Sequence, residues 1–158
     1  MNVNKPAQSS LSTTSDTDLI NLAKKLDINL KGIHMVNELP KKIQTGCYIV
    51  NSDDEYRGGK HWTCIYNDSN QKNCLHFDPF GVAIDLRIKK FMKTSNKHTG
   101  SLTTQIQSLN ENSCGYWVMF FLHMMDIGVS PVEFLSRFNG IDQDKNEKLL
   151  EKWFLKLK

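Results

Sequence analysis

Apolar residues recur at helical spacing in the first part of the chain. Between residues 16 and 27 they share one face of a helix and are Leu19, Leu22, Ala23 and Leu26. Ser15 precedes Asp18 by three residues, which is the spacing of a capping box at a helix start. The pattern predicts a helix over 16–27, and the polar composition of residues 1–14 predicts a flexible N-terminal tail.

Helical spacing returns in the second half of the chain. Residues 114–126 are apolar nearly all round, which predicts a buried helix. The segment Ser130–Glu133 combines a capping serine, a first-turn proline and an acid, and Gly140 suits the C-terminal cap of the helix that follows. Two more amphipathic helices are predicted, one over 83–93 and one through Leu149, Trp153, Phe154 and Leu157.

The middle of the chain has the residue types and period of strands. Residues 47–50 are predicted as a strand and residues 51–59 as a loop. Residues 61–66 and 73–78 are β-prone and flank a polar segment, so they predict a hairpin, and 102–106 predict another short strand. This order of elements predicts an α+β fold, with helices packed on a small mixed sheet.

Composition limits the classes of protein that the chain can be. Its 158 residues suit one domain, expected over 15–158, and 39% hydrophobic with 23% charged residues are enough to bury a core. No apolar run approaches the ~18 residues of a membrane span, and the N-terminus lacks the apolar core of a signal peptide. We therefore expect neither a membrane protein nor secretion by a signal peptide. Twenty Lys and Arg against 17 Asp and Glu give a net charge of +3, which permits weak attraction to polyanions without demonstrating it.

The four cysteines do not form a metal-binding pattern. Cys47, Cys64, Cys74 and Cys114 lie 17, 10 and 40 residues apart and include no C-x-x-C or C-x-x-H pair. We therefore expect no structural zinc, reduced thiols in an intracellular setting, and at most one chemically active thiol.

The predicted hairpin brings a histidine and a carboxylate together. If its turn is centred between Ser69 and Asn70, opposed residues have numbers that sum to 139, and His61 and Asp78 satisfy this sum. Opposed residues on antiparallel strands share a face, with Cβ atoms roughly 4.5–5.5 Å apart. Asp78 would then accept the ring N–H of His61, fix its tautomer and raise its pKa. A one-residue shift of this register would place the two on opposite faces.

Cys114 lies at the predicted start of the buried helix. A thiol in a first helical turn feels the positive end of the helix dipole, which stabilises the thiolate, and a neighbouring imidazolium stabilises it further. Gly115 would leave space for a substrate backbone to approach. Taken singly, a buried Cys, a strand-end His and an Asp before a Pro are more often structural. Taken together, they form a set of nucleophile, base and orienting group that chance supplies less readily.

Four short motifs follow one another in a familiar order. They are Gly58-Gly59-Lys60-His61-Trp62, Phe77-Asp78-Pro79-Phe80-Gly81, Gln107 and Cys114-Gly115. Over roughly Leu19 to Met125, their order and approximate spacing resemble the adenain-type family, the adenovirus maturation endopeptidases. The likeness is closest to the maturation proteases of virophages and Polinton-type elements. Ubiquitin-like-protein proteases share the wider order His, Asp, Gln, Cys, but the GG-x-HW and (D/E)-P-F-G signatures favour the adenain side.

This resemblance implies a papain-like or adenain-like cysteine protease fold with the nucleophile at a helix N-terminus. It implies Cys114 as nucleophile, His61 as general base and acid, and Asp78 as the orienting carboxylate. Gln107 would donate a side-chain N–H to the oxyanion hole together with the backbone N–H of Cys114. Gln105 is a nearby competitor for that role, and its distance from Cys114 fits the family less well.

The resemblance also implies substrates and a setting. Trp62, Gly59 and Gly115 are the residues expected to contact substrate. The expected activity is endopeptidase processing of viral capsid or other structural protein precursors during virion maturation. We expect a monomer that acts in the virion and in the host cell interior, where the virus assembles. No metal, cofactor or membrane partner is expected.

The sequence departs from the adenovirus enzyme in ways that affect activation. Asp78 stands where that enzyme has Glu, so the shorter side chain requires a closer approach to His61. The adenovirus enzyme is stimulated by DNA and by a disulfide-linked viral peptide, but residues 91–113 contain no cysteine for such a link. Stimulation by DNA stays open through a basic run, although such runs are usually solvated helix faces: Arg87, Lys89, Lys90, Lys93 and Lys97.

Three other functions stay open from the sequence. The first is removal of ubiquitin-like modifiers such as SUMO or ubiquitin, which cleavage after a C-terminal Gly-Gly would reveal. The second is acyl transfer to Lys or Ser, which an acetyl group left on Cys114 would reveal. The third is a non-enzymatic module that binds nucleic acid or a capsid protein, for which an unreactive Cys114 and salt-sensitive DNA binding would argue.

Overall fold

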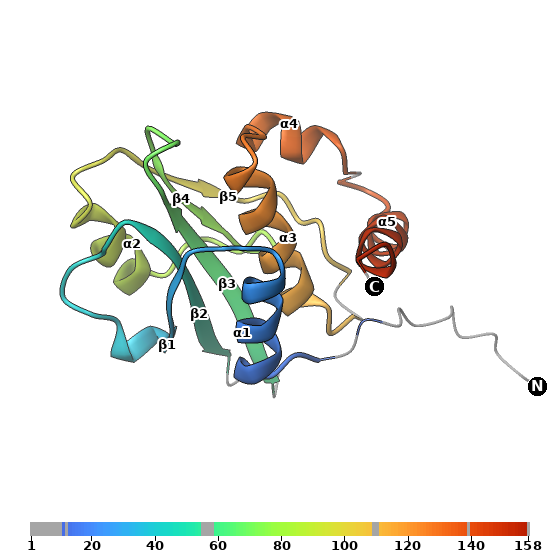
Figure 1. Ribbon diagram of the computed structural model, residues 1–158, viewed down its shortest axis with the longest axis horizontal. Helices are drawn as coiled ribbons and strands as arrows, with labels where there is room; N and C mark the ends of the chain where they lie inside the picture. The colour runs from blue at the N-terminus through green and yellow to red at the C-terminus, as the bar shows by residue number, and fades with distance from the viewer. Residues whose placement is uncertain (1–10, 12, 55–58, 109–110, 139, 158) are drawn as a thin grey trace, which may run out of the picture.

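The computed structural model describes residues 11, 13–54, 59–108, 111–138 and 140–157, and its centre is a five-stranded sheet (Figure 1). The strands stand in sequence order and are β1 (Leu30–Met35), β2 (Gly46–Asp54), β3 (Gly59–Asn67), β4 (Cys74–Phe77) and β5 (Thr99–Leu102). The helices are α1 (Asp16–Lys25), η1 (Val36–Glu38), α2 (Leu86–Lys93), α3 (Cys114–Asp126), α4 (Pro131–Ser136) and α5 (Gln143–Leu155). The predicted α+β fold is confirmed.

The sheet is mixed. β2, β3 and β4 form an antiparallel centre, whereas the edge strands β1 and β5 run parallel to their neighbours β2 and β4. The parallel β4–β5 pair needs a crossover connection, and α2 lies within that connection. This arrangement brings the end of β4 and the chain after β5 to the same end of the sheet.

Side chains that alternate along the strands build two separate cores. Ile49, Cys64 and Phe77 point to the face covered by α1 and α3 (Figure 1). Tyr48 and Ile65 point to the other face, which is covered by α2 and η1. Helices α4 and α5 also pack on α3, and Phe134 of α4 reaches Phe77 of β4, so α3 is enclosed and ten of its 13 residues are buried. This burial explains why its sequence lacks a polar face.

Local sequence signals fix several helix ends as predicted. The Ser15 side chain accepts the N–H of Asp18, and the Asp18 carboxylate accepts the N–H of Ser15, so the capping box at α1 is confirmed. The Ser130 side chain caps α4 by accepting the N–H of Glu133, without the return bond from the acid. Within the described ranges, no helix combines the length and the apolar character needed to span a bilayer.

Some strands differ from the sequence prediction. The pattern misses β1, whose residues are mostly half-buried and therefore carry a weak periodic signal. Residues 51–54 belong to β2 and not to the predicted loop 51–59, because they pair with the first residues of β3. β5 ends at Leu102, where the predicted strand 102–106 begins, and the chain beyond it turns toward the end of β4.

Helix boundaries and the hairpin register also differ. α2 begins at Leu86, capped by Asp85, and α4 ends at Ser136, so Gly140 does not cap it. The earlier end of α4 lets Phe138 pack edge-to-face on Trp117. In the β3–β4 hairpin, paired residues have numbers that sum to 141 and not to 139, since Cys64 pairs with Phe77.

The predicted N-terminal tail lies mostly outside the described residues. Within it, Leu11 and Thr14 are described, and both side chains are buried. Leu11 belongs to the core of the α3 face, and the carbonyl oxygen of Thr14 accepts the indole N–H of Trp62 at 3.3 Å. Packing against the domain therefore includes residues before Ser15.

Candidate active site

His61 and Asp78 form a close, buried pair at one end of the central strands. His61 lies in β3, and Asp78 follows the last residue of β4. The His61 Nε2 atom lies 2.7 Å from Asp78 Oδ1, and their side chains are only 10% and 7% exposed. Burial by itself lowers the pKa of His61, but the hydrogen bond to Asp78, the interaction with the Cys114 side chain and the nearby charges outweigh it and raise the pKa to about 9. A charged imidazole is therefore favoured at neutral pH.

The segment Asp78–Gly81 holds this pair in place. Asp78 Oδ1 also accepts the backbone N–H of Phe80 at 2.8 Å, so the carboxylate is oriented by its own turn. The ring of Phe80 stacks on His61, with ring centroids 4.5 Å apart and an angle of 21° between the planes. The carbonyl oxygen of Pro79 accepts the N–H groups of Ile106 and Gln107, each at 3.0 Å. The short motif thus connects the His61–Asp78 pair to the segment that carries Gln107.

Gly81 allows that connection to be close. Its φ of +67° lies in the left-handed region. A Cβ atom there would lie 2.6 Å from the backbone nitrogen of Gln105 and 2.6 Å from the carbonyl oxygen of Thr103. Only glycine therefore lets the two segments pack together in this conformation.

Cys114 is the first residue of α3 and is 7% exposed. Its side chain interacts with that of His61 and contributes to the raised pKa of the imidazole. Because Asp78 occupies Nε2, the ring nitrogen left for the thiol is Nδ1, which is buried and has no hydrogen-bonding partner among the described residues. The structure therefore brings His61, Asp78 and Cys114 together.

The other three cysteines have a different environment. Cys47, Cys64 and Cys74 are buried in strands, and like Cys114 they form no disulfide. Burial raises the pKa of Cys47 and Cys64, and it raises the pKa of Cys74 to about 11. These thiols are held in the neutral form, in which they are poor nucleophiles.

Gln107 is fully buried in the segment between β5 and α3. Its Nε2 atom donates to the carbonyl oxygen of Glu111 at 2.8 Å, which uses one of the two N–H groups of the amide. The predicted competitor, Gln105, is half-buried, and its Nε2 donates to the carbonyl oxygen of Gln107 at 3.2 Å. Gln105 thus supports the backbone of Gln107.

The residues expected to contact substrate lie in different settings. Trp62 is 1% exposed and packs in the core of the α3 face, to which Cys114 also belongs, and its contact with substrate stays a prediction. Gly59 is the first residue of β3, next to residues outside the described part of the chain, and its role stays a prediction. The space expected beside Gly115 is filled, because a Cβ atom there would clash with Oγ1 of Thr14. The expectation of open space at Gly115 is therefore wrong, since a buried residue of the N-terminal segment occupies it.

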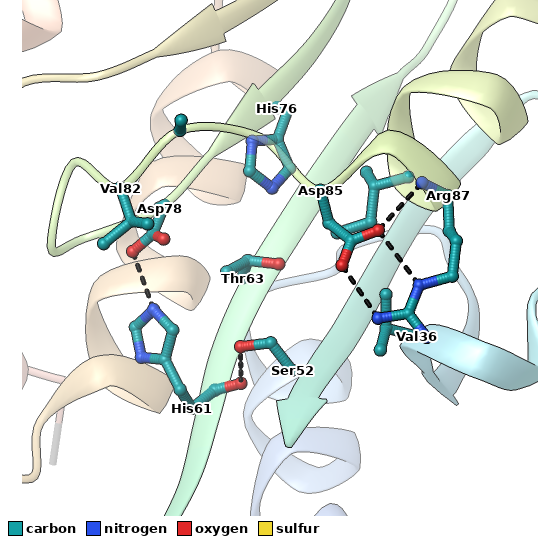
Figure 2. Close-up of a pocket in the computed structure, with 11 residues that line it drawn as sticks. Val36, Ser52, His61, Thr63, His76, Asp78, Val82, Asp85 and Arg87 are labelled. Carbon is teal, nitrogen blue, oxygen red and sulfur yellow. Dashed lines mark hydrogen bonds and ion pairs between the residues drawn. The ribbon is translucent and has the colours of Figure 1, made fainter. Parts of the chain in front are cut away.

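A pocket of about 260 Å³ opens beside the His61–Asp78 pair, on the sheet face that α2 covers (Figure 2). Figure 2 shows His61 and Asp78 pointing toward one another at its edge, with the Asp85–Arg87 ion pair on the far side. His76 lies between the His61–Asp78 pair and the Asp85–Arg87 ion pair in Figure 2, and its Nδ1 is 2.9 Å from the hydroxyl of Ser101. Burial lowers the pKa of His76 to about 4, so this second histidine is neutral where His61 is charged. In the described part of the chain, no group of three or more His, Cys, Asp or Glu side chains could hold a metal ion.

Residues 36–150 match the sequence model of a family described as adenovirus endoprotease. The match covers most of the chain and includes His61, Asp78, Gln107 and Cys114. The chain belongs to the adenovirus endoprotease family. No curated protein matches its sequence.

Solved structures support the family fold. Two crystal structures of the ASFV pS273R protease, one of them with selenomethionine, match this chain with TM-scores of 0.51 and 0.52. The sequence identities are 20% and 18%, and each match covers 66% of this chain. The matched region makes up 41% and 43% of that protease, so the chain spans less than half of its length. At this level of identity the likeness shows the fold.

The sequence did not reveal residues that support the site through their backbone groups or from a distant part of the chain. Pro79 contributes a carbonyl oxygen, Phe80 a ring and an N–H group, and both lie in a motif that the sequence did show. Asn146 and Glu147 in α5 contact the segment around Gln107, but they lie about 40 residues away in sequence. The one signal available for them was an Asn and a Glu on the apolar side of a predicted helix.

Proposed function

We propose that this chain is a cysteine endopeptidase with Cys114 as its nucleophile. The observation that supports this best is the 2.7 Å His61–Asp78 hydrogen bond beside the Cys114 thiol at the N-terminus of α3. The imidazolium and the helix N-terminus both favour a thiolate at this position. Asp78 holds Nε2, which keeps Nδ1 directed at the sulfur and stabilises the charged ring.

In the proposed reaction, His61 already holds at Nδ1 the proton given up by Cys114, and the thiolate sulfur forms a bond to the carbonyl carbon of the scissile peptide. The resulting oxyanion is stabilised by the backbone N–H of Cys114 and the second side-chain N–H of Gln107. The C–N bond then breaks as His61 donates its proton to the leaving amine. Water attacks the thioester, His61 takes its proton, and the C–S bond breaks to release the carboxylic acid and restore the thiolate.

The proposed substrates are capsid or other structural protein precursors of a virus, cut during virion maturation at the site of assembly in the infected cell. Family membership supports this choice, and the absence of a cysteine in residues 91–113 argues against a covalently linked peptide activator. We propose a monomer that needs no metal. Stimulation by DNA has less support, because Arg87 is paired with Asp85, and Lys97 Nζ donates to the carbonyl oxygens of Asp68 and Gln71.

Cleavage assays on three kinds of substrate test this proposal. The purified protein and its Cys114→Ala variant are incubated with a diverse peptide library, with structural precursors of its own virus, and with a ubiquitin-like fusion ending in Gly-Gly. Mass spectrometry should find cuts in the peptides and the precursors made by the wild type alone. Cuts confined to the Gly-Gly fusion would instead identify a modifier-specific protease. Equal cleavage by the Cys114→Ala variant would refute the proposed nucleophile.

A further inference from the structure

Two consecutive residues of α5 hold the segment that carries Gln107. Asn146, which is fully buried, donates its side-chain N–H to the carbonyl oxygen of Ile106 at 3.1 Å. Glu147, which is 3% exposed, accepts the backbone N–H of Ser108 at 3.2 Å. These two hydrogen bonds hold the backbone on either side of Gln107.

The Glu147 carboxylate also reaches the start of α3. Its Oε2 atom accepts the hydroxyl of Ser113 at 2.7 Å, and Ser113 directly precedes Cys114. Its Oε1 atom, which takes the Ser108 N–H, also accepts the indole N–H of Trp117 at 3.0 Å. One side chain therefore links the segment after Gln107 to the first turn of the nucleophile helix.

A carboxylate is an expensive group to bury at this position. Burial raises the pKa of Glu147, and so does the charge of Glu111, while the hydrogen bonds from Ser113, Trp117 and Ser108 oppose the rise. An apolar residue of similar volume would fill the space without this desolvation penalty. Yet within the described part of the chain, every hydrogen bond of this carboxylate comes from the Gln107 segment or from α3 and its capping residue.

We propose that Glu147 is a positioning residue for the oxyanion hole, which it sets by fixing the backbone of the Gln107 segment against the N-terminus of α3. Asn146 assists by holding the other side of Gln107. The inference rests on the proposed roles of Gln107 and Cys114. In this proposal α5, which lies far from the catalytic motifs in sequence, sets the geometry of the oxyanion hole that stabilises the transition state.

Three variants separate positioning from packing. Glu147→Leu keeps the approximate volume but removes both acceptor oxygens. Glu147→Gln keeps Oε1 for Ser108 and Trp117, and its amide can donate to the Ser113 hydroxyl, so it is the conservative variant. Asp144→Leu removes a carboxylate from the exposed face of the same helix and is the matched control. All three are assayed with a peptide that the wild type cleaves.

The expected result is a loss confined to the chemical step. Glu147→Leu should lower kcat by about 10-fold to 100-fold, below the ~10²–10³ typical for removing an oxyanion donor outright, with KM changed less than about threefold. Glu147→Gln and Asp144→Leu should stay within about threefold of the wild type. Alkylation of Cys114 by iodoacetamide, which needs no oxyanion hole, should keep its wild-type rate in all three.

A double-mutant cycle with Gln107→Ala decides whether Glu147 acts through Gln107. If it does, Glu147→Leu should lower kcat by less than about threefold in the Gln107→Ala background, because the group it positions is already absent. The same additional loss in both backgrounds would overturn the proposal. An unchanged kcat for Glu147→Leu alone would also overturn it.

Two further outcomes keep the result interpretable. If Glu147→Leu does not fold, Asn146→Ala enters the same cycle, and we expect a threefold to tenfold loss of kcat that disappears in the Gln107→Ala background. If Gln107→Ala cleaves as fast as the wild type while Cys114→Ala is inactive, the endopeptidase function stands and the positioning role of Glu147 is refuted.

Discussion

His61 and Asp78 are hydrogen-bonded across β3 and β4 although neither is the direct cross-strand partner of the other. Continuing the β3–β4 register, in which Cys64 pairs with Phe77, makes the two residues diagonal neighbours. Diagonal residues on one face have Cβ atoms ~7–8 Å apart, within reach of a histidine and a short carboxylate. The turn after β4, in which the Gly81 N–H bonds to the Asp78 carbonyl, brings the carboxylate to 2.7 Å from Nε2. This geometry accommodates Asp where the adenovirus enzyme has Glu.

The His61–Asp78 pair predicts the alkaline limit of activity. The imidazolium is present below a pKa of about 9 and is lost above it, so kcat/KM should fall as the pH rises through 9. Asp78→Asn removes the charge that raises this pKa, so the limb should move down toward the unperturbed 6.5. At neutral pH we also expect kcat to fall, near the lower end of the ~10²–10⁴ that a positioned acid or base contributes. A pH–rate profile measures both effects. If the alkaline limb of Asp78→Asn stays at the wild-type pH, that limb does not report the ionisation of His61.

Gly81 and Gly128 predict a contrast between strain alone and strain with a clash. Both have positive φ, at +67° and +92°, but a Cβ atom at Gly128 would meet nothing within 4 Å. Gly128→Ala should therefore lower the free energy of unfolding by about 1–2 kcal/mol, the cost of a left-handed residue, with kcat unchanged. Gly81→Ala should lower the free energy of unfolding by about 1–3 kcal/mol more than Gly128→Ala does, because its new Cβ overpacks the site. It should also lower kcat, because this Cβ displaces the backbone at Gln105. Denaturant unfolding measures the loss of stability, and peptide cleavage measures kcat. Equal effects of the two substitutions would contradict a clash at Gly81.

Gly115 and Thr14 predict a compensating pair. Gly115→Ala on its own should lower the free energy of unfolding by about 1–3 kcal/mol, because its Cβ would collide with the Thr14 side chain. Thr14→Gly removes the obstacle, so the same Gly115→Ala change should then cost little or even stabilise α3, since Ala is the better helix former by ~1 kcal/mol. Thermal and denaturant unfolding of the two single variants and the double variant form the cycle. Additive effects would show that Thr14 does not cover Gly115 in solution.

His76 predicts a loss of stability in mild acid. Its pKa falls from 6.5 to about 4 on folding, because a neutral ring is buried. The stabilisation that the neutral His76 gives to the folded state is therefore present above pH 6.5 and is lost as the pH falls toward 4. The loss in the free energy of unfolding is up to about 3 kcal/mol, at ~1.4 kcal/mol per pKa unit. His76→Leu should flatten the decline of unfolding free energy between pH 6.5 and 4. Comparing the variant with its parent removes the contributions of other titrating groups, and parallel pH curves would contradict a neutral buried His76.

The sequence predicts best where a structure depends on neighbouring residues. The capping box at Ser15, the serine cap at Ser130, the start of α3 at Cys114 and the hairpin between β3 and β4 all follow from patterns within a few positions. The assumed register was wrong by two residues, yet it placed His61 and Asp78 on the same face. An even shift preserves the face because side chains in a strand alternate with period two.

Features formed by distant segments needed the tertiary structure. The space beside Gly115 looks open in the sequence, but Thr14 fills it, and nothing near either residue indicates that contact. β1 escapes prediction because it is a half-buried edge strand with a weak pattern.

The sequence by itself determined the α+β class, the helix starts, and the order of His61, Asp78, Gln107 and Cys114 that indicates the family. Short-range geometry and residue chemistry carry all of these. Only the tertiary structure decided that Pro79 connects the Asp78 turn to Gln107, and that Asn146 and Glu147 hold Gln107 from the other side. The physical reason is that a hydrogen bond depends on distance in space, and the packing of α5 against α3 brings together residues that the sequence separates by about 40 positions.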